Sequence, residues 1–398
     1  MQAVPQCPFD HHAITDAEAA WGTYDQLRDQ GVTHSREHGG FYVLSRYEHV
    51  LAALRDPDTF ASGQGTRIPA IGDGMIIPLD FDPPGHTAYR ALITEHVTPE
   101  SVRGMVPGLR EMIDGLIDGF HAKGGGDWVA AVGLPLPLNV LVQVVGFAPE
   151  TVAQFRDLTA QSWKQISEQD LFAARAGLFE LVRRELQRHR ETRPDDYITS
   201  LIGKEIDGRP ITDDELQRLL LAFAVAGHET TMNASGSMLR YLVEDPARQG
   251  RLREKPELIP AFVEEVLRYS SPVQCIGRCT TRDVEIGGVR IPAGSRVLLV
   301  YAGANRDTAR FDHADAFDVD RGAAGHLAFG FGRHQCAGAL LARTELRLVL
   351  EKLVTMPEVE YAGAPDFGGL EGGAMSGPSY LPLRFTSNRS PDGAGAWR

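Results

Sequence analysis

The sequence predicts a mainly α-helical fold with small β-sheets, and its apolar spacing is the main reason. Apolar residues recur every three or four positions along Pro107 to Phe120 and Asp170 to Arg193, which is the period of a helix with one buried face. The longest such pattern begins with a capping box at Thr212 and ends before Pro246, so we expect one helix about 50 Å long that crosses the domain. Segments rich in β-forming residues are short by comparison.

Length and composition limit the class of protein. The chain has 398 residues, of which 43% are hydrophobic, and we expect residues 1–385 to form a single domain with a large core. Residues 386–398 are polar and glycine-rich, so they are predicted to be a disordered tail. The net charge of −13 argues against a nucleic-acid partner. Four cysteines are too few for a disulfide scaffold.

The N-terminus carries no recognisable targeting signal. It lacks a basic start and an apolar run, and no part of the chain approaches a membrane-spanning length of uninterrupted apolar residues. We therefore expect a cytoplasmic protein without a membrane anchor. Cys7, His11 and His12 could bind a metal ion, but a flexible polar terminus is the favoured interpretation.

The first ordered elements should be a helix at 17–30, a strand at 41–45 and a helix at 47–54. Glycines and prolines then punctuate residues 62–78, which nevertheless contain many apolar side chains, including Ile76 and Ile77. Long apolar loops often serve as lids or as walls of binding sites, although a surface loop is the alternative.

A helix that starts at two prolines places His86 and Arg90 on one face, because they are four positions apart. Two cationic donors on one face suit an anionic ligand, although such a pair is more often solvated. Further along, a buried helix is expected after Asn139. In the long helix, Ala226 and Gly227 would leave space over a ligand, and Thr230 can bend the helix by bonding a backbone carbonyl.

The C-terminal third should contain small strands. Apolar and polar residues alternate along 284–291 on both sides of a Gly-Gly pair, which predicts a hairpin. Residues 297–300 predict a buried strand. Residues 375–381 are interpreted as a hairpin whose tip reaches a pocket. Glu265 and Arg268 share one helix face, where an ordinary pair contributes a few tenths of a kcal/mol, roughly.

The stretch Phe329–Gly338 carries the strongest chemical signal. Two closely spaced glycines precede Cys336, and a third glycine opens an apolar helical run. A helix N-terminus favours an anion, and the thiolate is the form of cysteine that binds metals. A buried apolar cysteine is the bland alternative. The glycine spacing does not match a dinucleotide loop, and a zinc site would need more ligands nearby. Haem iron bound by a cysteine thiolate is the leading candidate.

These ten residues resemble the haem-binding loop of the cytochrome P-450 family, Phe-Gly-x-Gly-x-His/Arg-x-Cys-x-Gly, at every fixed position. Ala226 to Thr230 resembles the family's oxygen-activation motif, and Glu265-x-x-Arg268 resembles its Glu-x-x-Arg signature. The resemblance spans about residues 80 to 385 and implies the triangular haem-thiolate architecture.

The resemblance also implies roles for individual residues. For haem b, it implies Cys336 as the iron ligand, His86, Arg90, Arg278 and His334 at the propionates, and Phe329, Gly330 and Gly338 in the loop. For catalysis, it implies Glu229 as a proton relay and Thr230 as the residue that organises water. For the substrate pocket, it implies Ile76, Ile77, Phe223, Ala226, Gly227, Val273, Ile276 and Met375. For structural support of the loop, it implies a buried cluster of Glu265, Arg268 and Arg321.

The activity implied by the resemblance is that of a bacterial monooxygenase. Such an enzyme would insert one atom of O₂ into a hydrophobic small molecule, by hydroxylation or epoxidation, in natural-product or terpenoid metabolism. Electrons from NAD(P)H would arrive through a ferredoxin reductase and a ferredoxin, and the protein would be a monomer. Two alternatives remain: a non-catalytic haem sensor or electron-transfer protein, and a peroxide-driven enzyme. The Glu229–Thr230 pair argues against both.

Overall fold

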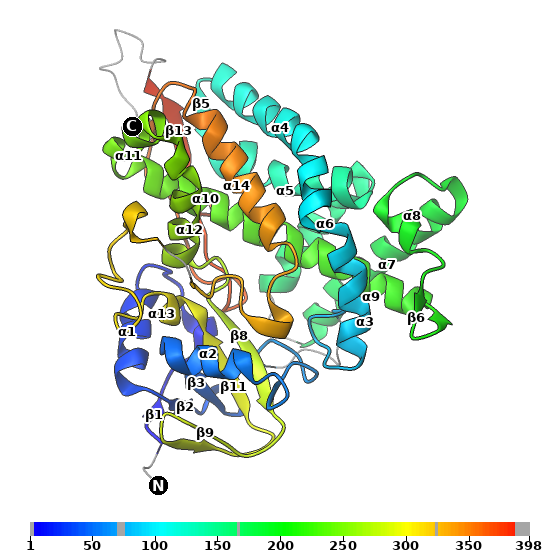
Figure 1. The fold of residues 1–398 in the computed structure, drawn as a ribbon, viewed down its shortest axis with the longest axis vertical. Helices are drawn as coiled ribbons and strands as arrows, with labels where there is room; N and C mark the ends of the chain where they lie inside the picture. The colour runs from blue at the N-terminus through cyan, green and yellow to red at the C-terminus, as the bar shows by residue number, and fades with distance from the viewer. Residues whose placement is uncertain (1–3, 70–75, 165–167, 323–324, 387–398) are drawn as a thin grey trace.

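Most strands lie at one end of the molecule and most of the long helices lie beyond them, although a smaller sheet lies among the helices at the other end (Figure 1). The main sheet lies at one end together with the N-terminus, and the long helices extend from it to the other end. The computed structural model describes residues 4–69, 76–164, 168–322 and 325–386. Residues 387–398, which make up nearly all of the predicted tail, lie outside this described part. The mainly helical fold with small sheets is confirmed.

The α-helices are α1 (Ala20–Gln30), α2 (Tyr47–Arg55), α3 (Gly85–His96), α4 (Pro99–Ala122), α5 (Pro135–Val140), α6 (Pro149–Lys164), α7 (Glu168–Thr192), α8 (Tyr197–Leu201), α9 (Asp213–Gly227), α10 (Glu229–Val243), α11 (Pro246–Glu254), α12 (Ile259–Ser270), α13 (Tyr301–Asn305) and α14 (Ala339–Leu353). Short 3₁₀ or π-helices are η1 (His11–Ala13), η2 (Glu37–Gly39), η3 (Val129–Gly133), η4 (Leu141–Val145), η5 (Pro256–Leu258), η6 (Val319–Arg321) and η7 (Gly332–His334). The strands are β1 (Gln6–Cys7), β2 (Thr33–Ser35), β3 (Phe41–Leu44), β4 (Phe60–Ala61), β5 (Gly125–Asp127), β6 (Glu205–Ile206), β7 (Arg209–Pro210), β8 (Cys275–Thr280), β9 (Val284–Ile286), β10 (Val289–Ile291), β11 (Arg296–Val300), β12 (Val359–Tyr361) and β13 (Pro382–Phe385).

The main sheet has the strand order β1-β2-β3-β11-β8-β4. Strand β11 runs parallel to β3, with Leu298 opposite Val43, and antiparallel to β8, with Leu298 opposite Gly277. The strands predicted at 41–45 and 297–300 are thus confirmed and are neighbours in space. Strands β9 and β10 form the predicted hairpin.

The largest apolar core lies among α4, α10, α12 and α14, four helices that are far apart in the sequence. Its fully buried members include Ile113, Met238, Phe262 and Val349, one from each helix. Helix α10 therefore has apolar neighbours on several sides, and this packing fixes the position of the residues at its N-terminal end relative to α14.

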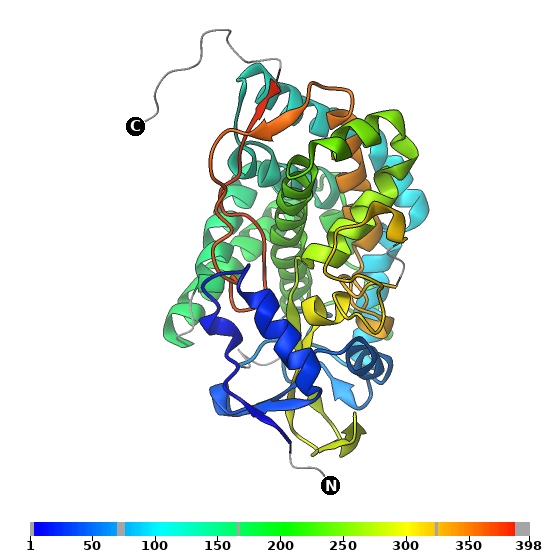
Figure 2. The same cartoon turned by 90° about the vertical axis from the view of Figure 1, so that its left-hand side faces the viewer.

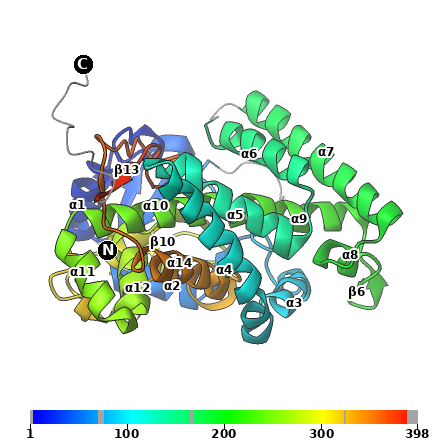
Figure 3. The same cartoon turned by 90° about the horizontal axis from the view of Figure 1, so that it is seen from above.

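The prediction of a single long helix that crosses the domain is wrong in one respect. Helices α9 and α10 lie in line across the molecule (Figure 3), but regular helical structure stops at His228. The capping box at Thr212 is present as predicted. The break follows a glycine and precedes two threonines, which all lower helix propensity. The region with the weakest helix formers is therefore where the helix opens.

Three further predictions of local structure need correction. Helix α4 begins at Pro99 and continues through Pro107, so the proline does not start it. The buried helix near Asn139 begins earlier, because Pro135 occupies its first turn, where a proline is tolerated. The N-terminus is ordered from residue 4, since β1 pairs with β2. Among the described residues, no helix has the length and apolar character needed to span a membrane.

Candidate functional site

The Phe329–Gly338 stretch forms a tight loop before α14. The Cys336 N–H donates to the Phe329 carbonyl oxygen over 2.8 Å and closes the loop. Gly330 and Gly332 have φ angles of 67° and 70°, a left-handed conformation that favours glycine. A Cβ at Gly332 would lie 3.0 Å from the Leu54 carbonyl oxygen. These two glycines therefore allow the loop to turn and to approach the neighbouring chain.

The electrostatics of Cys336 differ from the prediction. Cys336 is the exposed one of the four cysteines, and the other three are buried. Surrounding protein nevertheless desolvates the sulfur, and this burial raises the pKa of the Cys336 thiol. The Gly338 N–H, which bonds to the sulfur, and the charges of Arg90 and Arg343 lower it by less. The helix N-terminus alone does not favour the thiolate, so a bound metal cation would have to supply the remaining stabilisation.

A cluster of cationic side chains lies beside the loop. The rings of His86 and His334 are 4.4 Å apart. Burial and, to a smaller extent, the charges of Arg278, His86, Arg90 and Arg333 together lower the pKa of His334 to about 3. Five cationic or protonatable groups therefore converge on one place. Since like charges repel there, the cluster suits an anionic ligand.

Two members of this cluster lack the partners that buried polar groups normally have. Both ring nitrogens of His86 are buried without a hydrogen-bond partner among the described residues. Arg278 is buried, and its guanidinium donates to the Gly277 carbonyl oxygen over 2.8 Å. It forms no ion pair with the described residues. An unsatisfied buried donor costs about 1–3 kcal/mol, so His86 fits a carboxylate of a bound group, and the buried charge of Arg278 also suits an anionic partner. Arg90 instead donates to the Gln335 carbonyl oxygen over 2.6 Å.

The break between α9 and α10 presents an acid and a hydroxyl. The Thr230 hydroxyl donates to the Ala226 carbonyl oxygen over 2.9 Å, the backbone bond that the sequence suggested. Glu229 is buried, and its Oε2 has no hydrogen-bond partner in the part of the chain that the structure describes. Burial, with a smaller effect from the charge of Glu371, raises the pKa of Glu229 to about 8. Glu229 can therefore hold a proton at neutral pH and release it without a large cost.

The predicted pocket residues fall into two groups. Ala226 and Gly227 are exposed although they lie within a helix at the centre of the fold, so they face open space. Val273 pairs with buried Met375 in an isolated β-bridge, and Ile276 lies next along the same strand region. These five residues lie in three segments of the chain, namely the end of α9, the chain around the start of β8 and the C-terminal loop that carries Met375.

The remaining predicted pocket residues are placed differently. Ile77 is 1% exposed and belongs to the apolar core that includes α9. The Phe223 ring packs at 5.4 Å against the ring of Tyr197. Ile76 is half-buried. Ile77 and Phe223 thus have packing partners of their own, which a loop or helix pattern in the sequence does not reveal.

The predicted charge cluster is present and buried. The Arg268 guanidinium forms a bidentate salt bridge with the Glu265 carboxylate, with N···O distances of 2.7 and 2.8 Å. Neither side chain is more than 1% exposed. Arg321 also reaches Glu265, over 3.3 Å. The remaining donors of Arg268 bond to the carbonyl oxygens of Asn305 and Ala314. Arg268 therefore connects α12 to the chain that leads into the cysteine loop.

Several residues of the site were missed by sequence reasoning. Glu371 acts on the pKa of Glu229 from a C-terminal loop, and Arg67 opposes it from the segment after β4. Ser62 contacts the His334 ring, Oγ to Nε2, at 3.3 Å. Asn305 donates to Ser271 and accepts from the Leu327 N–H. These residues are far from the motifs along the chain and have no characteristic spacing, so no sequence signal marks them.

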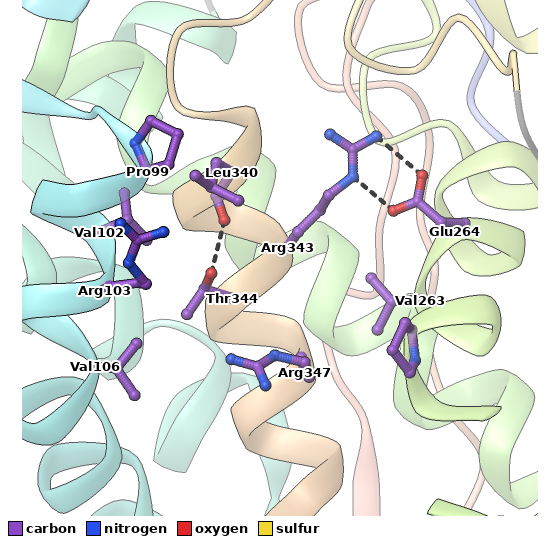
Figure 4. A pocket seen from close by; sticks show the side chains of 11 residues that line it. Pro99, Val102, Arg103, Val106, Val263, Glu264, Leu340, Arg343, Thr344 and Arg347 are labelled. Carbon is purple, nitrogen blue, oxygen red and sulfur yellow. Dashed lines mark hydrogen bonds and ion pairs between the residues drawn. The ribbon is translucent and has the colours of Figure 1, made fainter. Parts of the chain in front are cut away.

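A groove of about 310 Å³ lies between α4, α12 and α14 (Figure 4). Among the residues that line the groove, Arg343 forms a bidentate salt bridge with Glu264, with N···O distances of 2.6 and 2.9 Å. Arg103 and Arg347 also line the groove, and exposed Leu340 lies at its rim, about one helical turn after Cys336. The groove is lined in part by residues of α14, the helix that follows the cysteine loop.

We expect Glu345→Gln to change the pH dependence of stability. Glu345 is buried in α14, its Oε2 has no hydrogen-bond partner among the described residues, and burial raises its pKa from 4.5 to about 8. The folded protein then binds more protons than the unfolded chain between these two values, so the free energy of unfolding falls as pH rises through them. The fall is of the order of a few kcal/mol. Glutamine stays neutral and should remove it.

Urea unfolding across this pH range measures the effect. Wild type and Glu345→Gln should converge at the acid end, and the variant should be the more stable at the alkaline end. Exposed Glu257 provides the control, since Glu257→Gln should follow wild type throughout. Identical pH profiles for Glu345→Gln and wild type would contradict this account of the buried carboxyl.

The family follows from comparison with known proteins. Residues 139–365 match the cytochrome P450 family model. The chain is 32% identical over 387 residues to cytochrome P450 109 of Bacillus spizizenii, and the match covers 94% of each protein. It is 31% identical over 360 residues to a steroid C26-monooxygenase of Mycobacterium tuberculosis, and this match covers 88% of this chain and 96% of the relative. A Mycobacterium marinum P450 solved with pseudoionone superposes with a TM-score of 0.87 at 26% identity, covering 97% and 100%. The chain is a monooxygenase that belongs to the cytochrome P450 family.

Proposed function

We propose that this enzyme inserts one atom of O₂ into a hydrophobic small molecule, by hydroxylation or epoxidation. The observation that supports the proposal best is the helix break at His228, which presents a protonated acid and a hydroxyl at the open space beside Ala226 and Gly227. A haem sensor or electron carrier would need neither group. A peroxide-driven enzyme would not need proton delivery.

The residues present fit a haem. Cys336 would bind the iron through its sulfur, and His86, Arg278 and His334 would receive the propionates, since His86 has unsatisfied buried nitrogens and Arg278 is a buried cation. Arg90, which lies against the cysteine loop, would add positive charge there. Bound haem iron supplies the activation of O₂, with a thiolate ligand that favours O–O cleavage.

The chain's own contribution is to move protons and to exclude competing reactions. Glu229 holds its proton near neutral pH because it is buried, and it can pass that proton on when the site needs one. The Thr230 hydroxyl donates to the Ala226 carbonyl oxygen, which leaves its oxygen lone pairs free to accept from a water. The two residues together would hold water in one orientation beside the reacting atoms.

The substrate is proposed to be compact and apolar, with a terpenoid or related natural product as the best match. Val273, Ile276 and Met375 would form one apolar wall, and Ala226 and Gly227 would leave room for the molecule. The names of the relatives are in keeping with this, because one acts on a steroid and one was solved with pseudoionone.

Electrons are proposed to come from NAD(P)H through a ferredoxin reductase and a ferredoxin, with the enzyme acting as a monomer. A small acidic ferredoxin needs a positive face despite the chain's net charge of −13. Arg103 and Arg347 in the groove (Figure 4) and Arg333 on the cysteine loop would contribute to one, although Arg347 is paired with Glu351 and Arg333 with Asp58. Arg103 forms no ion pair with the described residues, so its charge is available.

The proposal is tested by coupling electron supply to a ligand screen. Purified enzyme with ferredoxin and ferredoxin reductase should consume more NAD(P)H when an apolar compound that shifts the haem spin state is added. One oxygen atom from isotopically labelled O₂ should appear in the product. If no spin-shifting compound raised consumption, the non-catalytic alternative would hold. If only added peroxide yielded product, the peroxide-driven alternative would hold.

Thr230→Ala should separate electron consumption from product formation. Loss of the hydroxyl removes one water-binding group at the helix break, and general acid–base groups contribute roughly 10²–10⁴-fold. We expect product per NAD(P)H to fall roughly tenfold or more, with the balance of electrons released as hydrogen peroxide. The spin-state shift on ligand binding should be unchanged. Thr231→Ala is the matched control, since its side chain points about 100° away around the helix.

A further inference from the structure

The ordered N-terminal segment brings three histidines together. His11 and His12 begin η1, and Asp10 caps it by accepting from the His12 N–H over 2.9 Å. His38 lies in η2, between β2 and β3. The centroids of the His11 and His12 rings are 4.3 Å apart, and the His38 ring lies 5.6 and 5.0 Å from them. One ring nitrogen of each histidine lies within 4.8 Å of one from each of the others.

Cys7 is not part of this cluster, although it is the thiol nearest in sequence. Its sulfur donates to the Thr33 hydroxyl over 3.3 Å inside the sheet. The third imidazole comes instead from His38, 26 residues after His12. The pairing of β1 with β2 and of β2 with β3 brings the two turns to the same place.

The three rings are held as metal ligands usually are. Histidines that bind metals commonly donate the other ring N–H to a backbone carbonyl or a carboxylate. Here Nε2 of His11 and of His12 contacts the Ile68 carbonyl oxygen, at 2.9 and 2.7 Å. Nε2 of His38 contacts Asp10 Oδ1 at 2.8 Å. Each ring is therefore oriented through one nitrogen.

One of the remaining nitrogens has no partner. His11 is 3% exposed, and its Nδ1 is buried without a hydrogen bond among the described residues. Such an atom costs about 1–3 kcal/mol when it is left unsatisfied. This buried nitrogen is therefore available as a metal ligand.

We propose that His11, His12 and His38 bind a Zn²⁺ ion. Zinc takes imidazole ligands in a tetrahedral arrangement, and three protein ligands leave its fourth position to water or to a carboxylate such as Asp10. The two charged groups that act on the cluster are Asp10 and Arg67. The negative charge of Asp10 offsets the repulsion of the ion by Arg67.

The ion would tie together segments that are distant in the sequence. A Cβ at Gly373 would lie 2.7 Å from His11 Cδ2 and 3.0 Å from His12 Nδ1, so the C-terminal loop packs directly on the histidines. Figure 2 shows this loop running beside the N-terminal segment, to which it is bonded through Leu370 and Ile14. Met375, which the proposed function places in the substrate wall, follows in the same loop. The zinc site would therefore brace that wall.

Metal binding by the untagged holoenzyme tests the proposal. The protein is freed of loosely bound metal with a chelator, dialysed against Zn²⁺ and analysed for zinc per haem, and its affinity is measured by titration calorimetry. We expect one zinc per haem in wild type and a higher melting temperature with zinc. His38→Gln should lower the affinity by roughly 10–100-fold or more, and Asp10→Asn by roughly 10–100-fold.

One variant serves as the control for this test, and either of two results would contradict the proposal. His34 lies on β2 outside the cluster, so His34→Gln should keep wild-type zinc content and affinity. The haem spectrum of each variant shows whether it has folded, and His12→Gln provides a second ligand variant if His38→Gln does not fold. Zinc content that is unchanged in the ligand variants, or a wild-type protein that retains no zinc, would overturn the proposal. Both readouts are independent of monooxygenase activity.

Discussion

Cys336→Ser is expected to abolish the thiolate-type spectrum of the reduced carbon monoxide complex and all monooxygenase activity. Serine can occupy the loop, since the backbone bond from residue 336 to Phe329 does not involve the side chain. Its hydroxyl is far less acidic than a thiol and does not supply the electron density of a thiolate. Ultraviolet–visible spectroscopy of the reduced, carbon monoxide-bound protein measures the change.

Cys279→Ser is the matched control for this experiment. Cys279 is buried in β8 and its sulfur lies 3.8 Å from the Thr280 carbonyl oxygen, away from the loop. The control should keep the thiolate-type spectrum. A Cys336→Ser protein that also kept this spectrum would contradict the assignment of the iron ligand, and with it the placement of the haem.

Arg268→Ala is expected to lower the free energy of unfolding by about 3–5 kcal/mol, because it leaves the carboxylate of Glu265 buried with only Arg321 as its ionic partner. It also removes the donors that hold the Asn305 and Ala314 carbonyl oxygens beside the chain leading to the cysteine loop. We therefore expect haem content to fall together with stability. Urea unfolding and the haem-to-protein ratio measure the two effects.

An exposed ion pair provides the comparison for this variant. Arg251 and Asp320 also form an ion pair between α11 and the chain before the cysteine loop, but their side chains are 40% and 61% exposed. Exposed pairs of this kind contribute about 0–1 kcal/mol, so Arg251→Ala should be close to wild type. If Arg268→Ala were as stable as Arg251→Ala, the buried cluster would have no structural role.

Sequence reasoning succeeded where a short motif carries its own geometry. The glycines around Cys336 and the bond from Thr230 to Ala226 involve residues within a few positions of each other, so spacing is enough to predict them. The pair Glu265 and Arg268 is local as well, and its partner Arg321 was reached through the family resemblance.

Sequence reasoning was insufficient where tertiary packing decides between segments that have similar local sequence patterns. The apolar character of the loop residue Ile77 and the helix residue Phe223 does not reveal that each packs against other side chains, and their place in a pocket wall stays a prediction. The N-terminal histidines were interpreted as part of a flexible terminus, because nothing near them in the sequence shows that His38 and Ile68 would cover them.

The sequence by itself determined the mainly helical fold and predicted the groups of the site: the thiol of Cys336, the acid of Glu229 and the hydroxyl of Thr230. Only the tertiary structure decided how readily these groups hold a proton. Burial raises the pKa of both Glu229 and Cys336, and it leaves His86 and His11 with unsatisfied nitrogens. Desolvation depends on the summed packing of segments far apart in the chain, and no local pattern of residues encodes that sum.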